Sequence, residues 1–242
     1  MHDFSGKTVV VTGGTGGIGG AVACAFRDSG AIVIATGWGD AELDMRRADP
    51  TFTGIGIEPL NVASDEAVAE FAGRLSACDV LVNLAGVSIR QGEVFSPQSF
   101  QANFEINMLG TLRTSNALLP LLEASGEGAI VNTASMTSFL GTPTAPGYAA
   151  SKGAVAQATK SMAIAWAPRG VRVNAVAPGW IKTPMSTAHL TPEFEDRISK
   201  RTPMGRWGEP GHLAGPVLFL ASPQAAWVTG VILPVDGGYL AM

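Results

Sequence analysis

Short runs of apolar and β-branched residues alternate with helix-forming segments along the whole chain, and this alternation restricts the possible fold more than any other feature. Seven runs are expected to form strands, at residues 8–12, 31–36, 55–62, 79–84, 128–134, 171–177 and 231–235. Helical patterns separate most of them, the longest extending from about Pro97 to Glu123. Such alternation is typical of a parallel sheet with helices packed on both of its faces. The sequence therefore predicts a doubly wound α/β fold with about seven parallel strands.

The length and composition fit one domain. The chain has 242 residues, of which 46% are hydrophobic and 15% are charged, so it can bury a large core. No linker, repeat or low-complexity tract divides it, and residues 1–242 are expected to form a single domain. The segment 183–211 is rich in Pro, Gly, Trp and Met, and we interpret it as a partly mobile loop with a short helix.

Composition also argues against several classes of protein. The formal net charge is −4, whereas nucleic-acid-binding proteins carry basic surfaces. No apolar run reaches the ~18 residues that a membrane span needs, and the N-terminus lacks the apolar core of a signal peptide. Cys24 and Cys78 are isolated, and His2, His189 and His212 are scattered, so we expect no metal site. Two isolated cysteines favour a reducing, cytoplasmic setting.

Six glycines follow the first expected strand and precede a helical pattern that extends to about Ser29. They are Gly13, Gly14, Gly16, Gly17, Gly19 and Gly20. In a strand–turn–helix unit, backbone amides and the helix N-terminus can hold the pyrophosphate of a dinucleotide. Gly14-x-Gly16-x-x-Gly19 satisfies the usual pattern, although other registers also fit and a plain flexible turn is the alternative. The unit favours a Rossmann-type, dinucleotide-binding domain.

A group of polar side chains lies between Ser135 and Lys152. Ser135 closes the expected strand 128–134, and Tyr148 and Lys152 are four residues apart, which places them on one face of a helix. A free tyrosine has a pKa near ~10, and a neighbouring ammonium lowers that pKa. Such a tyrosine can act as a general acid or base, while the serine hydrogen-bonds the oxygen that exchanges the proton. The alternative is an ordinary amphipathic surface pair beside an ordinary strand end.

Four of these segments directly follow expected strands. They are the glycine turn, residues 83–86, Ser135 and residues 178–183. In open parallel sheets, ligands bind beyond the carboxyl ends of the strands. The four segments are therefore expected to converge on one crevice, which favours an active site over four unrelated loops.

Together these motifs resemble the short-chain dehydrogenase/reductase superfamily over nearly the whole chain. Within it the chain is similar to 3-oxoacyl-carrier-protein reductases and to sugar or polyol dehydrogenases. The signature Thr-Gly-x-x-x-Gly-x-Gly of the family matches residues 12–19, and its Asn-x-Ala-Gly matches residues 83–86. Its Pro-Gly-x-x-x-Thr segment matches Pro178, Gly179 and Thr183. The catalytic Asn, Ser, Tyr and Lys of the family fall on Asn107, Ser135, Tyr148 and Lys152.

The resemblance implies hydride transfer between a nicotinamide ring and a carbonyl or secondary alcohol. Tyr148 would exchange the proton with the substrate oxygen, which Ser135 would orient. Lys152 would lower the tyrosine pKa and hold the nicotinamide ribose, and Asn107 would anchor a water that links Lys152 to solvent. The implied cofactor contacts are Gly13, Thr15, Gly17, Ile18, Gly19, Trp38, Asn61, Val62, Asn83, Ala85, Gly86, Tyr148, Lys152, Pro178, Gly179, Ile181 and Thr183.

A few positions bear on the choice between NAD(H) and NADP(H). NAD-preferring members of the family usually carry an acid at the end of the second strand, where this chain has Gly37. NADP-preferring members often carry Arg or Lys there or just before the second signature glycine, and this chain has Trp38 and Gly16 at those places. A phosphate site normally needs a dedicated cation, so the sequence favours NAD(H) over NADP(H). Nearby side chains that could reach the ribose or a 2′-phosphate are Asp40, Arg46 and Arg47.

Three functions remain open. The first is an oxidoreductase for a small polar substrate such as a sugar, polyol or hydroxy acid. The second is a 3-oxoacyl-thioester reductase, whose carrier-protein partner would favour a basic patch; Arg113, Arg169 and Arg172 are scattered candidates. The third is a non-catalytic dinucleotide-binding sensor, which would not need all four of the matched Asn, Ser, Tyr and Lys.

Two further expectations concern the pocket and the assembly. The loop from Met185 to Trp207 is expected to line the substrate pocket with His189 and Trp207. The small-residue helix at residues 149–158 and the apolar C-terminus at 231–242 offer flat faces that a monomer would leave exposed. Similar members of the family are usually tetramers, so we expect a homotetramer with two-fold interfaces.

Overall fold

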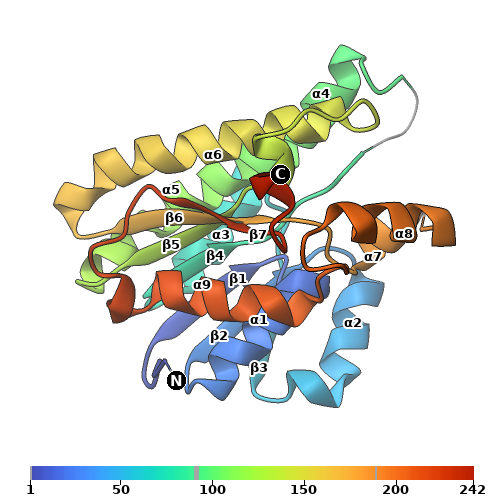
Figure 1. Cartoon of the computed structure of the whole chain (residues 1–242). Coiled ribbons are helices and arrows are strands. Elements are labelled where there is room, and N and C mark those ends of the chain that lie inside the picture. Colours follow the sequence, from blue (N-terminus) through green and yellow to red (C-terminus); the bar gives the residue numbers. More distant parts are fainter. Residues whose placement is uncertain (1, 90–92, 189) are drawn as a thin grey trace.

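The apolar segment Thr8–Thr12 forms strand β1 inside a seven-stranded sheet, in a computed structural model that describes residues 2–89, 93–188 and 190–242. The strand order is β3-β2-β1-β4-β5-β6-β7 and each neighbouring pair is parallel (Figure 1). The other strands are β2 (Ile32–Gly37), β3 (Ile55–Pro59), β4 (Val80–Asn83), β5 (Ala129–Thr133), β6 (Arg172–Pro178) and β7 (Ile232–Val235). The predicted doubly wound topology is confirmed. The chain adds β2 and β3 on one side of β1 and β4 to β7 on the other, so the strand order reverses between β1 and β4.

The third strand is shorter than predicted. It ends at Pro59 rather than at Val62, because the chain turns after it. The Leu60 N–H still donates to the Gly37 oxygen at 2.9 Å, and Asn61 Oδ1 then accepts a hydrogen bond from the Ala63 backbone N–H at 3.0 Å, which forms the turn. The turn takes Asn61 and Val62 out of the sheet and leaves them at its carboxyl edge.

Two layers of helices cover the sheet (Figure 1). One layer contains α1 (Gly17–Asp28), α2 (Asp40–Ala48) and α9 (Ala214–Ala221). The other contains α3 (Asp65–Arg74), α4 (Pro97–Phe104), α5 (Gly110–Ala124) and α6 (Pro146–Trp166). Short 3₁₀ turns occupy residues 50–52, 136–138, 167–169, 210–213, 223–225 and 239–241.

The alternation of side chains along the strands builds a separate core under each layer. Val9 and Val11 of β1 are fully buried in the cluster that contains Phe26 of α1. Val10, between them in sequence, is fully buried in the cluster that contains Leu118 of α5. A strand buried on both faces reads as a continuous apolar run, which is why the sequence revealed these strands so clearly.

A π-helical segment interrupts the long helix that the sequence predicts. Glu105–Leu109 has the wider π geometry between α4 and α5, and Asn107 lies in its middle. One-turn π segments recur at functional sites because the inserted residue changes the direction of the side chains around it. The single predicted helix is therefore two α-helices joined by a π turn.

The segment 183–211 contains more regular structure than the loop with one short helix that we expected. It holds α7 (Pro184–Thr187) and α8 (Pro192–Arg201), and both follow the carboxyl end of β6 (Figure 1). Each begins with Pro in its first turn, and Thr183 and Thr191 occupy the N-cap positions. Prolines that the sequence suggested as chain breakers therefore start helices here.

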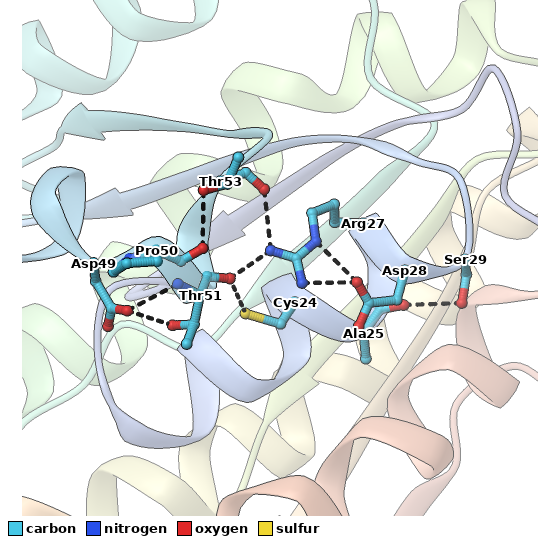
Figure 2. A network of polar contacts seen from close by, with 9 residues as sticks. All are labelled: Cys24, Ala25, Arg27, Asp28, Ser29, Asp49, Pro50, Thr51 and Thr53. Atoms are coloured by element: carbon cyan, nitrogen blue, oxygen red, sulfur yellow. Dashed lines mark hydrogen bonds and ion pairs between the residues drawn. The ribbon is translucent and has the colours of Figure 1, made fainter.

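A polar network fastens the connection after α2 to α1 (Figure 2). The Arg27 guanidinium donates to the backbone oxygens of Thr51 and Thr53, and its Nε donates to Asp28 at 2.9 Å. Asp49 accepts from the backbone N–H of Thr51 at 2.9 Å and caps the short turn that follows it. The network fixes the end of α2 against α1, so the two helices that border the glycine turn are held together.

Candidate active site

A cleft of about 1360 Å³ opens at the carboxyl ends of the strands. All four segments that were predicted to converge contribute to its walls, together with the start of α6 and one side of α8. The lining includes residues 13, 15–19, 37–38, 84–88, 133–137, 178–181 and 183–186. The topology of the sheet thus brings together residues that are more than 150 positions apart in the sequence.

The glycine turn fits a pyrophosphate. Gly13 has a φ of +65°, and a Cβ on Gly19 would lie 2.0 Å from the Gly13 carbonyl oxygen, so neither position accepts a side chain. Helix α1 begins directly after it, without a side-chain cap and without an acidic residue in its first turn. The first N–H groups of α1 and the positive end of its dipole are therefore left for an anion.

Ser135, Tyr148 and Lys152 all line the cleft. Lys152 is buried, and its Nζ donates to the backbone oxygen of Thr133 at 2.7 Å. The same nitrogen lies 5.9 Å from the centroid of the Tyr148 ring. Burial lowers the pKa of Lys152 from 10.5 to about 8. The predicted pairing of a phenol and an ammonium on one face of α6 therefore exists, inside the cleft rather than on the surface.

The loop after β5 is fastened to α6 by a serine that the sequence analysis did not single out. The Ser138 hydroxyl donates to the backbone oxygen of Lys152 at 2.7 Å and accepts from the backbone N–H of Ser135 at 3.2 Å. The Ser135 hydroxyl accepts from both the N–H and the hydroxyl of Thr137. Ser138 thereby fixes the distance between the serine and lysine backbones. Its signal in the sequence was its place three residues after Ser135, as in a capping box.

Asn107 is fully buried but does not line the cleft. Its side-chain amide donates to the Val87 oxygen and to the Ser151 hydroxyl, each at 2.9 Å, and accepts from the Val87 N–H at 2.8 Å. Ser151 in turn donates to the Tyr148 backbone oxygen at 2.7 Å. Asn107 therefore connects the loop after β4 with the turn of α6 that carries the tyrosine.

Asn83, which we expected among the cofactor contacts, has a buried side chain that does not line the cleft. Its Nδ2 donates to Ser115 at 3.0 Å and to Asn132 at 2.9 Å, and its Oδ1 accepts from Thr114 at 2.7 Å. The side-chain amide is thus fully used between the sheet and α5, whereas the next residues, Leu84 to Ser88, form the wall of the cleft.

At the end of β2 the structure reveals an acid that the sequence analysis missed. A Cβ on Gly37 would lie 2.1 Å from Thr15 Oγ1, so the threonine fills the place that the usual acidic side chain would take. The same hydroxyl donates to the carboxylate of Glu42 on α2, which also lines the cleft. Of the side chains considered earlier, Asp40 and Arg47 lie outside the cleft lining. Glu42 is four residues before Arg46, so the two share one face of α2, and this spacing was the signal for Glu42 in the sequence.

Arg46 lines the same end of the cleft but is already bound to the protein. Its Nε donates to the Thr15 backbone oxygen at 2.8 Å, and its Nη1 lies 3.1 Å from Asp49. The guanidinium also stacks on Phe52, with 5.0 Å from its central carbon to the ring centroid.

On the substrate side, helix α8 supplies four lining residues that the sequence analysis did not name: Phe194, Arg197, Ile198 and Arg201. Trp207, which we expected in the lining, is buried behind the cleft and packs on Trp180 with ring centroids 5.2 Å apart. Its bulk supports the wall instead of forming it. His189, the other expected residue, lies outside the described residues.

Comparison with known proteins agrees with this geometry. The family model described as "Enoyl-(Acyl carrier protein) reductase" matches residues 13–240. A galactitol 2-dehydrogenase (L-tagatose-forming) of Cereibacter sphaeroides is 39% identical over 98% of this chain and 96% of its own length. A 3-oxoacyl-[acyl-carrier-protein] reductase of Thermotoga maritima is 34% identical over 97% of this chain and 98% of its own.

A solved structure shares the whole fold. A gluconate 5-dehydrogenase from Burkholderia cenocepacia J2315, in complex with NADP and tartrate, matches with a TM-score of 0.90 and 33% identity. The match covers 99% of this chain and 97% of the other. The chain belongs to the short-chain dehydrogenase/reductase superfamily. It is an oxidoreductase that acts on CH–OH groups with a nicotinamide cofactor, NAD or NADP.

No helix in the described ranges is long and apolar enough to cross a membrane. The same residues contain no cluster of three or more His, Cys, Asp or Glu side chains that could hold a metal ion. Cys24 and Cys78 are both free thiols.

Proposed function

We propose that this short-chain dehydrogenase/reductase interconverts a ketone and a secondary alcohol in a small polar substrate such as a sugar, polyol or hydroxy acid. The observation that carries the proposal is the presence of Ser135, Tyr148 and Lys152 in one cleft with a glycine turn that fits a pyrophosphate. The nicotinamide cofactor supplies or accepts the hydride. We infer that residues 1–242 act as one catalytic domain.

In this proposal Tyr148 gives the proton to the ketone oxygen during reduction and takes it back during oxidation. The Ser135 hydroxyl donates a hydrogen bond to the same oxygen and holds it in place. Lys152 favours the phenolate by its charge and donates to the nicotinamide ribose with the N–H groups that Thr133 does not use. Asn107 keeps the turn of α6 in position and anchors a water that links Lys152 to solvent.

A substrate panel with NADH and with NADPH tests this function. We expect turnover of small polar ketones and of the corresponding alcohols. Turnover in the wild type that disappears in Tyr148→Phe would support the proposal. A wild type that binds either dinucleotide but turns over no substrate would instead favour the alternative of a non-catalytic sensor.

Reduction of a 3-oxoacyl thioester is the second candidate, and the similarity to the 3-oxoacyl-[acyl-carrier-protein] reductase of Thermotoga maritima favours it. A carrier protein needs a basic patch, and the three arginines considered for that patch are already bound within the chain. Arg113 is paired with Asp65 and Glu105, and Arg169 is paired with Glu123. Arg172 donates to backbone oxygens of the α9 end. A 3-oxoacyl thioester in the panel, with and without the carrier protein, decides between the two candidates.

We further propose that the enzyme prefers NAD(H) to NADP(H), although the gluconate 5-dehydrogenase compared above binds NADP. Glu42 supports this preference because its carboxylate lines the cleft beside Thr15 and Gly37, where the adenosine ribose hydroxyls are expected. A carboxylate can accept hydrogen bonds from a ribose diol and repels a 2′-phosphate. Arg46, the cation in reach, is already bound to Asp49.

Cofactor fluorescence titration of Glu42→Gln measures this contribution. We expect weaker NADH binding and tighter NADPH binding in the variant, so that the ratio of the two dissociation constants changes by about tenfold. Asp44→Asn is the matched control, because Asp44 is on the same helix, pairs with Arg47 and does not line the cleft. A wild type that binds NADPH clearly more tightly than NADH contradicts the proposal.

We also propose a homotetramer in the cytoplasm. The exposed small side chains of α6 support the assembly, and the two free thiols support a reducing compartment. Fractionation of the source cells tests the compartment, and detection of the protein outside the cytoplasmic fraction would contradict it.

A further inference from the structure

Helix α8 turns one stripe of side chains toward the cleft. Phe194, Arg197, Ile198 and Arg201 line it, at the spacings of three and four residues that define one face of a helix. Asp196 and Lys200 lie outside the lining and pair with each other, with 2.6 Å between Nζ and Oδ2. The helix therefore presents two arginines to the substrate side of the cleft.

Among the described residues, neither Arg197 nor Arg201 has a carboxylate within ion-pair distance. Both guanidiniums contact aromatic rings instead. Arg197 lies 5.0 Å from the centroid of Phe194, and Arg201 lies 4.3 Å from that of Tyr239. Stacking uses the flat face of a guanidinium and leaves the N–H groups at its edge for an anion.

The support behind these arginines is rigid. Trp180, Phe194 and Trp207 form a cluster with ring centroids 5.1 to 6.0 Å apart. Glu195 of α8 pairs with Lys182 at 2.8 Å, which ties the helix to the segment that follows β6. Tyr239, the platform of Arg201, is itself held, because Asp236 accepts from the backbone N–H groups of Gly238 and Leu240. The aromatic contacts therefore hold the two guanidiniums at the wall of the cleft.

We propose that Arg197 and Arg201 bind a carboxylate of the substrate, so that the enzyme acts on a hydroxy acid or keto acid of sugar size. This inference rests on the proposed hydride transfer. In reduction the ketone carbon gains the hydride and its oxygen gains the proton of Tyr148, while the carboxylate stays unchanged and serves to hold the molecule. A guanidinium fork matches the two oxygens of a carboxylate better than the scattered hydroxyls of a neutral polyol.

The charges around α8 favour a small acid over an acidic carrier protein. Glu193 and Asp196 are exposed on α8 outside the cleft lining, so the outer side of this helix carries acids as well as bases. An acidic protein on the outer side of α8 would meet those carboxylates as well as the two exposed arginines, whereas a small acid inside the cleft meets the arginines alone. Glu42, the one acid among the described lining residues, is at the adenosine end.

Steady-state kinetics with matched substrates test the proposal. The probes are aldonates of four to six carbons, their amides, and the neutral polyols of the same chain length. The variant is the double substitution Arg197→Met and Arg201→Met, and Lys200→Met on the same helix is the control. We expect the wild type to favour the acid over its amide, and the double variant to raise KM for the acid about 10²-fold. Its kcat, its KM for the amide and its NADH affinity should change less than about threefold.

A binding measurement separates failure of this inference from failure of the proposed function. An aldonate, added with NADH, should raise the melting temperature of the wild type and of Lys200→Met but not of the double variant. This shift without turnover of any substrate would keep the carboxylate site and reject hydride transfer. Turnover of amides, polyols or thioesters without any preference for the acid would keep hydride transfer and reject the carboxylate site. Equal losses for acid and amide in the double variant would also reject it.

Discussion

Lys152 is a buried charge at the wall of the cleft, where the proposed function gives it two partners. Among the described residues it is the charged side chain with the least exposure, at 4%. Burial disfavours its charged form, and no described carboxylate compensates it. One of its three N–H groups reaches Thr133, and the others remain for ligands inside the cleft. A residue held at such a cost is best explained by the chemistry of Tyr148 and of a bound ribose.

The substitution Tyr148→Phe should remove the proton transfer and leave the fold intact, because only a hydroxyl is lost. We expect turnover to fall by at least ~10²–10⁴-fold, with the NADH dissociation constant changed less than about threefold. Steady-state kinetics and cofactor titration measure the two quantities. Near wild-type turnover in this variant would disprove the proposed role of Tyr148.

The lowered pKa of Lys152 predicts a pH dependence of stability. Between about pH 8 and 10.5 the unfolded chain binds the proton and the folded chain does not, so rising pH favours the folded state. Below pH 8 the buried ammonium is charged in both states and its full cost is present. Relative to Lys152→Met, which lacks this proton, the wild type should gain roughly 2 kcal/mol of unfolding free energy from pH 7 to pH 10.

Denaturant unfolding of both proteins at several pH values provides this measurement. Because the two proteins share their other titrating groups, the difference between their unfolding free energies reports on Lys152 alone. A constant difference from pH 7 to pH 10 would mean that Lys152 has an ordinary pKa in the folded protein.

At the scale of elements, a buried polar network joins strands β4 and β5 to helices α5 and α6. Asn83 of β4 bonds Asn132 of β5 at 2.9 Å, and Asn132 Nδ2 donates to Thr159 of α6 at 3.0 Å. Ser115 and Thr114 connect the same network to α5. Each group is satisfied, so the network fixes the register of β4 and β5 under α5 and α6. It lies beneath the cleft and holds the loops that form the cleft.

Replacement of Asn83 by Ala should separate stability from cofactor binding. The loss removes the donor to Asn132 Oδ1 and to the Ser115 hydroxyl, while Thr114 can still donate to the Gly110 oxygen, so the unfolding free energy should fall by about 2 kcal/mol. The NADH dissociation constant should change less than about threefold, because the side chain does not line the cleft. Denaturant unfolding and cofactor titration are the measurements. Lost cofactor affinity at unchanged stability would support Asn83 as a cofactor contact.

At the scale of the whole molecule, α6 serves the active site with one end and offers a surface with its outer side. Ala150 and Gln157 are exposed, and Ile164 is 79% exposed near the end of the helix. A Cβ on Gly153 would meet no atom within 4 Å, so this side of α6 is open. Small residues on an open face allow the backbone of a second helix to approach closely.

We predict a mass of four times the 24.9 kDa of the chain by light scattering at micromolar concentration. Gly153→Arg should reduce that mass, since it fits the single chain but blocks a helix that packs on α6. Gly73→Arg on α3, where a Cβ also has open space, is the matched control and should leave the mass unchanged. A wild-type monomer would contradict the tetramer, and a tetrameric Gly153→Arg would exclude this face as the interface.

The sequence by itself predicted seven strands, their parallel pairing and the glycine turn, because buried strands and tight turns have a characteristic local composition. It also placed Ser135, Tyr148 and Lys152, since helical spacing and strand ends are local rules. Tertiary structure decided which side chains face the cleft. Asn83 turned inward because Asn132, Ser115 and Thr114 surround it, and Trp207 packed behind the wall on Trp180.

Tertiary structure also decided which charges are free to act. Arg46 and Arg113 are tied to acids, whereas Arg197 and Arg201 face the cleft without one among the described residues. No local pattern distinguishes these arginines, because a charge is satisfied by partners that the fold brings from elsewhere in the chain. Spacing along one element therefore predicted the acid–base pair, the resemblance of the joint motifs implied the reaction, and the packing of distant elements decided which charges line the cleft.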